Sequence, residues 1–395
     1  MISESKLERL DLSKYKKNIE KHEKKSLSEY RRDIETCFGT SCNFCEKDCQ
    51  VYQLKKVKTY TSRGKNRTML GLLEGKVGYS EELADLFYTC TLCASCDARC
   101  AFRNTHRFLE MRRELVRKGL GKKEHKAVVD TIVTKGDMLG DTRSPAKIFE
   151  EDINKARVHA RYKVPMFVGC MYKSMPEELR KIISVLGRLG VALEFIDEKC
   201  CGYPVYALGY EKEFESVKKN FIASLGKNAD KGILTVCPTC TAFLNEEHGI
   251  NAVHAVELAA DLVDDDETKK KIKKLDLKAT YHDPCHLARG LGVTEPPRKL
   301  IRSLGIELVE MHANRLFSKC CGGGGGMLIR DRELSEEIAK RRLEQAREVS
   351  VDKLIVSCPT CDQNLTNASF AKKEKGQKRV KVLNIWNLLD DALEK

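Results

Sequence analysis

Residues 234–240 are Leu-Thr-Val-Cys-Pro-Thr-Cys, and residues 355–361 are Ile-Val-Ser-Cys-Pro-Thr-Cys. In both copies a short, mostly apolar run, typical of a buried strand, leads directly into two cysteines. Two strands that end at paired thiols are therefore predicted. The segments that flank these two strands also occur twice in the sequence.

Three further pairs of segments match around these copies. The first pair ends in a lone cysteine and consists of Phe167–Cys170 and Tyr281–Cys285. The second contains Cys-Cys-Gly and consists of Glu198–Gly202 and Phe317–Gly322. The third is a strand-like tail and consists of Ala252–Leu258 and Val382–Leu388. An internal duplication of this kind predicts two copies of one structural unit. The lysine-rich stretch 264–278 is interpreted as a helix end and linker between them.

Secondary-structure patterns divide the chain into two regions. Apolar positions recur at helical spacing in Glu81–Tyr88 and Thr105–Lys118, so residues from about Ile2 to Arg157 are predicted to be mostly helical. Beyond them, strand-like runs alternate with helical stretches such as Pro176–Leu189. This alternation predicts an α/β region of parallel sheets with crossover helices.

Each repeat contains five cysteines, and each cysteine follows a short apolar run. In a parallel sheet all five thiols can therefore converge at the carboxyl ends of the strands, where such folds place ligands. Adjacent cysteines diverge too far to share one tetrahedral ion easily, but they can bind two atoms of a larger cluster. The two sets are Cys170, Cys200, Cys201, Cys237 and Cys240, and Cys285, Cys320, Cys321, Cys358 and Cys361.

Glycine follows each cysteine pair, and the second pair opens a run of five glycines from Gly322 to Gly326. Because glycine has no Cβ, we expect Gly202, Gly322 and Gly323 to let the backbone approach a bulky inorganic core. A flexible loop is the alternative explanation of the run.

The helical region contains two runs of four cysteines. They are Cys37, Cys42, Cys45 and Cys49, and Cys90, Cys93, Cys96 and Cys100. The second run has the spacing of a bacterial ferredoxin motif, in which three close thiolates bind one cubane and the fourth cysteine ligates the other cluster. In the first run the opening gap is four residues instead of two, and Gln50 and Ala101 replace the proline that usually follows each run.

Two [4Fe-4S] cubane clusters are therefore expected in the helical region. By the motif's crossed pattern, one is assigned to Cys37, Cys42, Cys45 and Cys100, and the other to Cys49, Cys90, Cys93 and Cys96. A pair of zinc sites is the alternative, although zinc ligands usually come as separated pairs. We expect a helical ferredoxin-like domain at residues 1–160 and two α/β repeats at 161–275 and 276–395.

Composition argues against several classes of protein. The formal charge is +13, but thiols that bind metal lose their protons and the basic runs alternate with acidic residues, so no nucleic-acid partner is expected. No apolar stretch is long enough to span a membrane, and the charged N-terminus lacks a secretory signal. We therefore expect a cytoplasmic protein, in which eighteen cysteines favour metal binding over disulfides.

At these cysteines the sequence resembles the CCG-domain proteins, whose repeat is a lone cysteine, a Cys-Cys-Gly and a Cys-x-x-Cys. The gaps between these elements are 29 and 35 residues in the first copy and 34 and 36 in the second. With the N-terminal cysteine runs, the resemblance covers nearly the whole chain and extends to the family of the heterodisulfide reductase D subunit.

That resemblance implies a fold and a reaction. Each complete repeat would bind a noncubane [4Fe-4S] cluster on its five cysteines, giving up to two such clusters, and the pair would cleave a disulfide or oxidise the corresponding thiols. The cubanes would relay electrons singly. Basic residues beside the cysteines could bind anionic substrate groups or donate protons, although such residues more often hydrogen-bond cluster sulfurs or lie at the surface: Lys199, His282, His286, Arg289 and Lys319.

No flavin or nicotinamide fingerprint is present, so electrons are expected to come from another subunit. In the D-subunit family that partner is a membrane cytochrome b, which would place this chain at the inner face of the membrane. A soluble flavoprotein is equally compatible with the sequence.

Two other functions remain open at this stage. One is an electron-transfer subunit of a lactate, glycolate or glycerol-3-phosphate dehydrogenase, although those relatives often have incomplete repeats whereas both copies here keep all five cysteines. The other is a zinc-stapled interaction protein.

Overall fold

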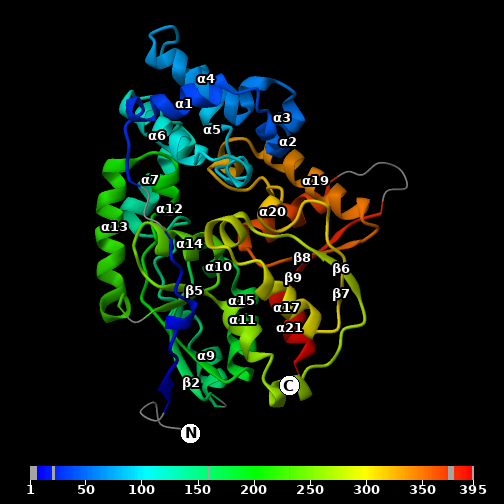
Figure 1. Cartoon of the computed structure of the whole chain (residues 1–395). Helices are drawn as coiled ribbons and strands as arrows, with labels where there is room; N and C mark the ends of the chain where they lie inside the picture. The colour runs from blue at the N-terminus through cyan, green and yellow to red at the C-terminus, as the bar shows by residue number, and fades with distance from the viewer. Residues whose placement is uncertain (1–6, 20–22, 159, 231, 372–377, 394–395) are drawn as a thin grey trace.

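The computed structural model describes residues 7–19, 23–158, 160–230, 232–371 and 378–393. Helices dominate the N-terminal part, and those between residues 31 and 117 lie at the top of Figure 1, above the parts that contain the sheets. The predicted helices are present as α5 (Glu81–Tyr88) and α6 (Asn104–Arg117). The others are α1 (Arg31–Gly39), α2 (Phe44–Asp48), α3 (Gln50–Lys55), α4 (Ser62–Leu73), α7 (Lys123–Lys135), α8 (Pro145–Ile148) and α9 (Glu150–Arg157).

The first sheet is entirely parallel and is built around β2 (Tyr162–Phe167). Strand β3 (Val191–Phe195) lies on one edge of β2, and β4 (Ile233–Thr235) lies on the other edge, followed by β5 (Ala252–His254). The alternation of strands and helices therefore gives the parallel α/β arrangement expected from the sequence.

One short strand of this sheet comes from the start of the chain. Strand β1 (Glu8–Arg9) pairs in parallel with Tyr162 and Lys163 of β2, whereas β4 pairs only with Met166 and Phe167. The prediction of a mostly helical beginning is therefore wrong for this segment, because β1 covers a stretch of strand edge that β4 does not reach and so satisfies its backbone groups.

The second sheet has the order β7-β6-β8-β9, which matches the order β3-β2-β4-β5 of the first. Its strands are also parallel: β6 (Lys278–Tyr281), β7 (Glu307–Leu308), β8 (Lys353–Val356) and β9 (Lys381–Asn384). The duplication inferred from the sequence is thus a duplication of sheet topology.

Helices connect the strands of both sheets. In the first repeat they are α10 (Cys170–Lys173), α11 (Pro176–Arg188), α12 (Tyr203–Ala207), α13 (Glu211–Leu225), α14 (Pro238–Glu246) and α15 (Ala255–Leu262). The linker carries α16 (Asp266–Lys270). The second repeat has a π-helical turn (His286–Gly290), α17 (Glu295–Ser303), α18 (Met327–Arg330), α19 (Arg332–Glu348), α20 (Pro359–Phe370) and α21 (Ile385–Ala392).

The parts of the chain share one hydrophobic core. Tyr88 of the helical part, Phe167 of the first repeat and Trp386 of the second belong to the same buried cluster. The two repeats also meet through α11 and α21, where the Arg188 guanidinium donates to the Leu393 carbonyl at 2.8 Å. Domain boundaries at residues 160 and 275 therefore stay a prediction.

Candidate functional site: two cysteine sets around one cavity

The five cysteines of the first repeat follow three neighbouring strands, as expected. Cys170 begins α10 just after β2, and Cys237 and Cys240 lie at the first turn of α14 after β4. The thiols of Cys170 and Cys200 are in contact, and the Sγ atoms of Cys201 and Cys240 lie 3.8 Å apart. The fold therefore gathers the set at the carboxyl end of the sheet.

The second repeat gathers its cysteines in the same way. The Sγ atoms of Cys321 and Cys361 lie 3.3 Å apart, and the thiols of Cys320 and Cys358 contact these two in turn. Cys285 follows β6, is half-buried and lies near Cys321 and Cys358.

Both sets face a single cavity of about 820 Å³. All ten cysteines line it: Cys170, Cys200, Cys201, Cys237, Cys240, Cys285, Cys320, Cys321, Cys358 and Cys361. Leu139 and Ile329, which are both strongly exposed, contribute apolar surface to the same cavity. Sequence spacing predicted two convergent sets, but not that the sets share one space.

The donor set fits iron-sulfur clusters better than single ions. A structural zinc ion takes four ligands, whereas ten thiols meet here. Hydrogen bonds from Cys200 and Cys240 lower the pKa of the Cys201 thiol to about 6, and those from Cys320 and Cys361 lower the pKa of Cys321. Each repeat thus offers a thiolate, the form that binds metal.

The helical part closes a smaller cysteine cavity of about 40 Å³. Cys49, Cys90, Cys93 and Cys96 line it together, so the structure brings Cys49 of the first run to three cysteines of the second. Burial raises the pKa of the Cys96 thiol well above its ordinary value. The buried ammonium of Lys65 is the cation of this cavity and lowers the pKa of Cys49 and Cys90 against the effect of burial.

The other expected cubane set lies farther along the helical part. Asn66 Nδ2 donates to Cys37 Sγ at 3.4 Å, and Arg63 binds the carbonyl oxygen of Cys42 at 2.8 Å. Cys45 lies near Cys37. Cys100 lines a different cavity together with Cys93, and its assignment to this cubane stays a prediction.

The second CCG set touches the helical part directly. Cys320 lines the small cavity of Cys49, Cys90, Cys93 and Cys96, and its thiol contacts that of Cys93. Cys320 Sγ also lies 3.4 Å from Thr91 Oγ1. The cubane-type cysteines therefore approach the large cavity from the side of the second repeat.

The glycines beside the cysteine pairs are required by the packing of the protein itself. Gly323 also lines the large cavity, and the approach of these glycines to an inorganic core stays a prediction. A Cβ on Gly322, whose φ is +93°, would lie 2.4 Å from the Ser335 carbonyl oxygen, and one on Gly323 would lie 2.6 Å from the Thr360 side chain. Gly202, with φ +87°, would meet Phe214 at 2.9 Å. These glycines are required by neighbouring protein atoms and by backbone conformation.

The rest of the glycine run packs against the helical part rather than forming a free loop. A Cβ on Gly325 would lie 2.7 Å from the Cys90 carbonyl oxygen, and one on Gly324 would lie 2.9 Å from the Thr91 carbonyl oxygen. Close approach of the two backbones is therefore the reason for these glycines.

Among the described residues, one of the five basic candidates lines the large cavity. His286 does so, and its Nε2 lies 3.2 Å from the Tyr203 hydroxyl. Lys199 is exposed beside Gly136, and Lys319 forms an ion pair with Asp48 at 2.5 Å. Neither lysine lines the large cavity, and contact of these two side chains with a substrate stays a prediction.

Arg289 and His282 are held by the protein. Arg289 donates to the carbonyl oxygens of Cys93 and Ser318, at 2.7 and 2.6 Å. His282 is buried and accepts a hydrogen bond at Nδ1 from Arg342. Neither side chain lines the large cavity.

Polar residues that sequence reasoning missed also line the cavity. Gln363 and Asn367 lie four residues apart on α20, and Arg332 begins α19. The spacing of Gln363 and Asn367 after the Cys-Pro-Thr-Cys motif could have indicated a shared helix face, whereas no local signal marks Arg332.

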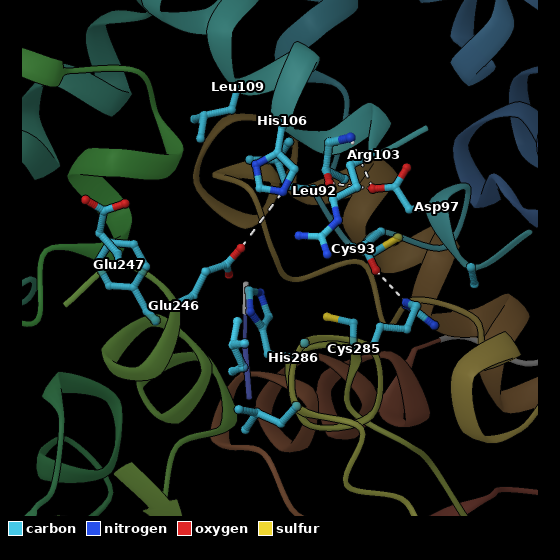
Figure 2. Close-up of a pocket in the computed structure, with 18 of the residues that line it drawn as sticks. Leu92, Cys93, Asp97, Arg103, His106, Leu109, Glu246, Glu247, Cys285 and His286 are labelled. Carbon is cyan, nitrogen blue, oxygen red and sulfur yellow. Dashed lines mark hydrogen bonds and ion pairs between the residues drawn. The ribbon is translucent and has the colours of Figure 1, made fainter. Parts of the chain in front are cut away.

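A second cavity of about 910 Å³ lies on the other side of Cys285 and His286, which line both cavities. Figure 2 shows Cys285 and His286 on one wall and Cys93 with Asp97 on another. His106 and Glu246 face each other across it at 3.9 Å.

Two family models match the chain. The cysteine-rich domain, CCG, matches residues 164–245 and 279–366, and the 4Fe-4S dicluster domain matches residues 14–104. The chain carries two CCG domains and a 4Fe-4S dicluster domain. The ten cysteines of its two repeats and its two N-terminal cysteine runs fall inside the matched segments.

Relatives of this CCG-domain protein are redox enzymes. It is 32% identical to the B subunit of fumarate reductase (CoM/CoB) from Methanothermobacter marburgensis, over 77% of this chain and 61% of that protein. It is 28% identical to the D subunit of dihydromethanophenazine:CoB–CoM heterodisulfide reductase from Methanosarcina acetivorans, over 86% of this chain and 90% of the relative. It is also 24% identical to the EtfAB:quinone oxidoreductase of Syntrophomonas wolfei, of which it covers 48%.

These matches make the CCG-domain protein an iron-sulfur oxidoreductase similar to the D subunit of heterodisulfide reductase. In the described part of the chain, no helix is long and apolar enough to cross a membrane.

Proposed function

We propose that this protein reduces a disulfide to two thiols, or runs the reverse oxidation, in the cavity between its two cysteine sets. One observation carries the proposal: all ten cysteines of the two repeats line the same cavity of about 820 Å³. Reduction of one disulfide takes two electrons and two protons and yields two thiols. A cavity with one five-cysteine set on each side suits a substrate with two sulfur atoms.

The proposed cofactors are one noncubane [4Fe-4S] cluster on each five-cysteine set and two cubanes in the helical part. When bound, the noncubane clusters would supply electrons one at a time and take up each departing sulfur as a thiolate. The polypeptide contributes the enclosure: buried cysteines on both sides, apolar surface from Leu139 and Ile329, and the polar side chains of Gln363 and Asn367.

The electron path proposed here enters through the second repeat. Its support is the contact between Cys93 of the helical part and Cys320 of the second repeat. A separate subunit would supply or accept the electrons, either a membrane cytochrome b or a soluble flavoprotein. A cytochrome b partner would hold the protein at the inner face of the membrane.

A second candidate is a pure electron relay, in which this chain never meets a sulfur substrate. It is favoured by the similarity to the EtfAB:quinone oxidoreductase of Syntrophomonas wolfei. Under that function the large cavity would have no small-molecule ligand.

Anaerobic spectroscopy during titration with small thiols and disulfides separates the two functions. We expect a new paramagnetic signal when a thiol binds to oxidised protein, and loss of this signal in Cys320→Ser and in Cys200→Ser. Both residues line the large cavity.

Cys42→Ser is the control, because Cys42 is exposed and is not among the residues that line the large cavity. This variant should keep the thiol-dependent signal while losing turnover with an external electron donor. A wild-type protein that holds its clusters but gives no thiol-dependent signal would favour the relay.

A further inference from the structure

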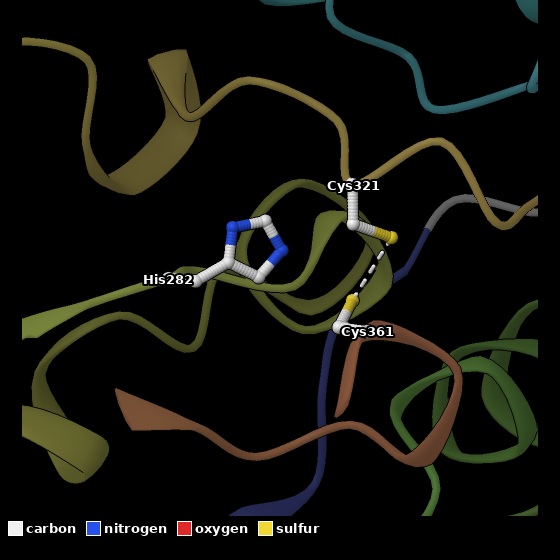
Figure 3. Close-up of side chains that lie close together, drawn as sticks. All are labelled: His282, Cys321 and Cys361. Atoms are coloured by element: carbon white, nitrogen blue, oxygen red, sulfur yellow. Dashed lines mark hydrogen bonds between the residues drawn. The ribbon is translucent and has the colours of Figure 1, made fainter. Parts of the chain in front are cut away.

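The two cysteine sets differ at one buried position next to the sulfur atoms. In the second repeat His282 follows β6, and one of its ring nitrogens lies within 4.8 Å of the Cys321 and Cys361 thiols. Figure 3 shows one ring nitrogen facing the two sulfurs while the other points away from them.

The first repeat has an apolar residue at the same place. In the first repeat Met166 pairs with Leu234, and in the second repeat Tyr281 pairs with Ile355. Leu234 and Ile355 each stand three residues before a Cys-Pro-Thr-Cys motif, so Met166 and Tyr281 are equivalent positions. The next residue along each strand is then Phe167 in the first repeat and His282 in the second. Phe167 is buried and packs against Phe221 with ring centroids 5.5 Å apart.

Arg342 determines which nitrogen of His282 carries the proton. Its Nε donates to Nδ1 of His282 at 3.1 Å. A guanidinium can only donate, so Nδ1 must present its lone pair and the hydrogen must be on Nε2. Arg342 is itself fully buried and held by the Ala313 carbonyl oxygen at 3.1 Å and by Gln345 at 2.6 Å.

This tautomer decides what His282 can do. A neutral imidazole nitrogen that carries a hydrogen has no lone pair for a metal ion. By distance alone, His282, Cys321 and Cys361 form a group that could hold a metal. The hydrogen bond from Arg342 places the hydrogen on Nε2, the ring nitrogen that faces the two sulfur atoms.

We propose that His282 is a positioning residue that donates a hydrogen bond to sulfur in the second cysteine set and so makes the centre there easier to reduce than the centre in the first. The inference rests on the clusters of the proposed function. Hydrogen bonds to cluster sulfurs and local charge both set the reduction potential. A donated hydrogen bond stabilises the extra negative charge of the reduced state.

The surrounding charges act in the same direction. Arg342 and Arg289 lie near the second set. Because Cys93 contacts Cys320, the easier centre to reduce is also the one next to the helical part.

An anaerobic redox titration of the full chain, followed by electron paramagnetic resonance, tests this inference without any substrate. His282→Leu should make reduction of the second centre at least tenfold less favourable, a shift of about 59 mV to lower potential for one electron. The iron and sulfide content should stay that of the wild type. His282→Gln, which retains an N–H donor, should recover most of the shift.

Phe167→Leu is the matched control in the first repeat, and it should leave the potential of the second centre unchanged. Loss of iron from the second set in both His282 variants would overturn the inference. That result would show that His282 is a metal ligand and not a hydrogen-bond donor. Equal potentials in wild type and His282→Leu would overturn it as well. A wild-type protein without iron beyond the two cubanes would refute the noncubane clusters of the proposed function, and this inference with them.

Discussion

At the scale of single residues, Arg112 joins the parts of the molecule that the proposed electron path crosses. Its buried guanidinium donates to the carbonyl oxygens of Phe87 and Cys90 in the helical part, Ala207 in the first repeat and Gly325 in the second. Buried carbonyl groups without a partner are costly, so this one side chain fixes three chain segments relative to each other.

Arg112→Met should therefore lower the free energy of unfolding by about 3 kcal/mol, because several buried carbonyls lose a charged donor. Anaerobic denaturant unfolding measures the change. Arg302→Met, at an exposed position on α17, is the control and should change stability by less than about 0.5 kcal/mol. Equal stability of the two variants would contradict this role of Arg112.

Gly322 is the second residue with a specific structural requirement. Gly322→Ala should destabilise the protein by about 2 kcal/mol or more, since φ is +93° and the new Cβ would lie 2.4 Å from a backbone oxygen. Gly78→Ala, where no atom lies within 4 Å of the added Cβ, should have a small effect. Thermal unfolding of both variants before clusters are loaded is the measurement. A backbone requirement at Gly322 lowers stability in that state, whereas a role only in contacting a cluster does not.

At the scale of elements, the two repeats begin their last helices with different capping residues. His254 caps α15, its Nδ1 accepting from Val256 N at 3.3 Å and its Nε2 facing the Val236 carbonyl oxygen at 2.8 Å. Asn384 caps α21 by accepting from Trp386 N at 3.0 Å. Only the histidine cap can titrate, so the two equivalent elements respond differently to acid.

Burial lowers the pKa of His254 from 6.5 to about 3 in the folded protein. The unfolded chain therefore binds a proton that the folded chain does not, and stability is lost as pH falls from about 6.5 toward 3. We expect the free energy of unfolding of His254→Asn to fall less steeply than that of the wild type, by about 1 kcal/mol per pH unit between pH 6 and pH 4. Denaturant unfolding at a series of pH values measures the two slopes; parallel slopes would show that His254 does not contribute.

At the scale of the whole molecule, one cysteine of the first N-terminal run joins three cysteines of the second run. Cys49 of the first run lines the small cavity with Cys90, Cys93 and Cys96 of the second run, and Cys320 of the second repeat lies in the same cavity. The cluster proposed there is therefore the one next to the second repeat.

Cys49→Ser should remove that cluster, and Cys42→Ser should remove the other cubane. Both variants should lose about four irons per chain, the content of one cubane. Magnetic coupling between a cubane and the second repeat's centre should vanish only in Cys49→Ser. Coupling that survives in Cys49→Ser and vanishes in Cys42→Ser would reverse the assignment.

The sequence by itself determined the architecture. Strand-like runs that end at cysteines occur in two copies and predicted parallel sheets with thiols at their carboxyl ends. The helices Glu81–Tyr88 and Pro176–Arg188 also lie where periodicity places them. Local patterns suffice here because burial periodicity and chain connectivity determine both features.

Tertiary structure alone decided how the sets are combined and what the polar residues beside them do. Three findings depend on contacts between residues far apart in the chain. All ten thiols face one cavity, β1 joins the first sheet, and Arg342 fixes the tautomer of His282. The same is true of Lys319, whose partner Asp48 lies 271 positions away. A basic residue beside a cysteine has the same local sequence whether it faces substrate or forms an internal ion pair, so only the packing of distant segments distinguishes the two.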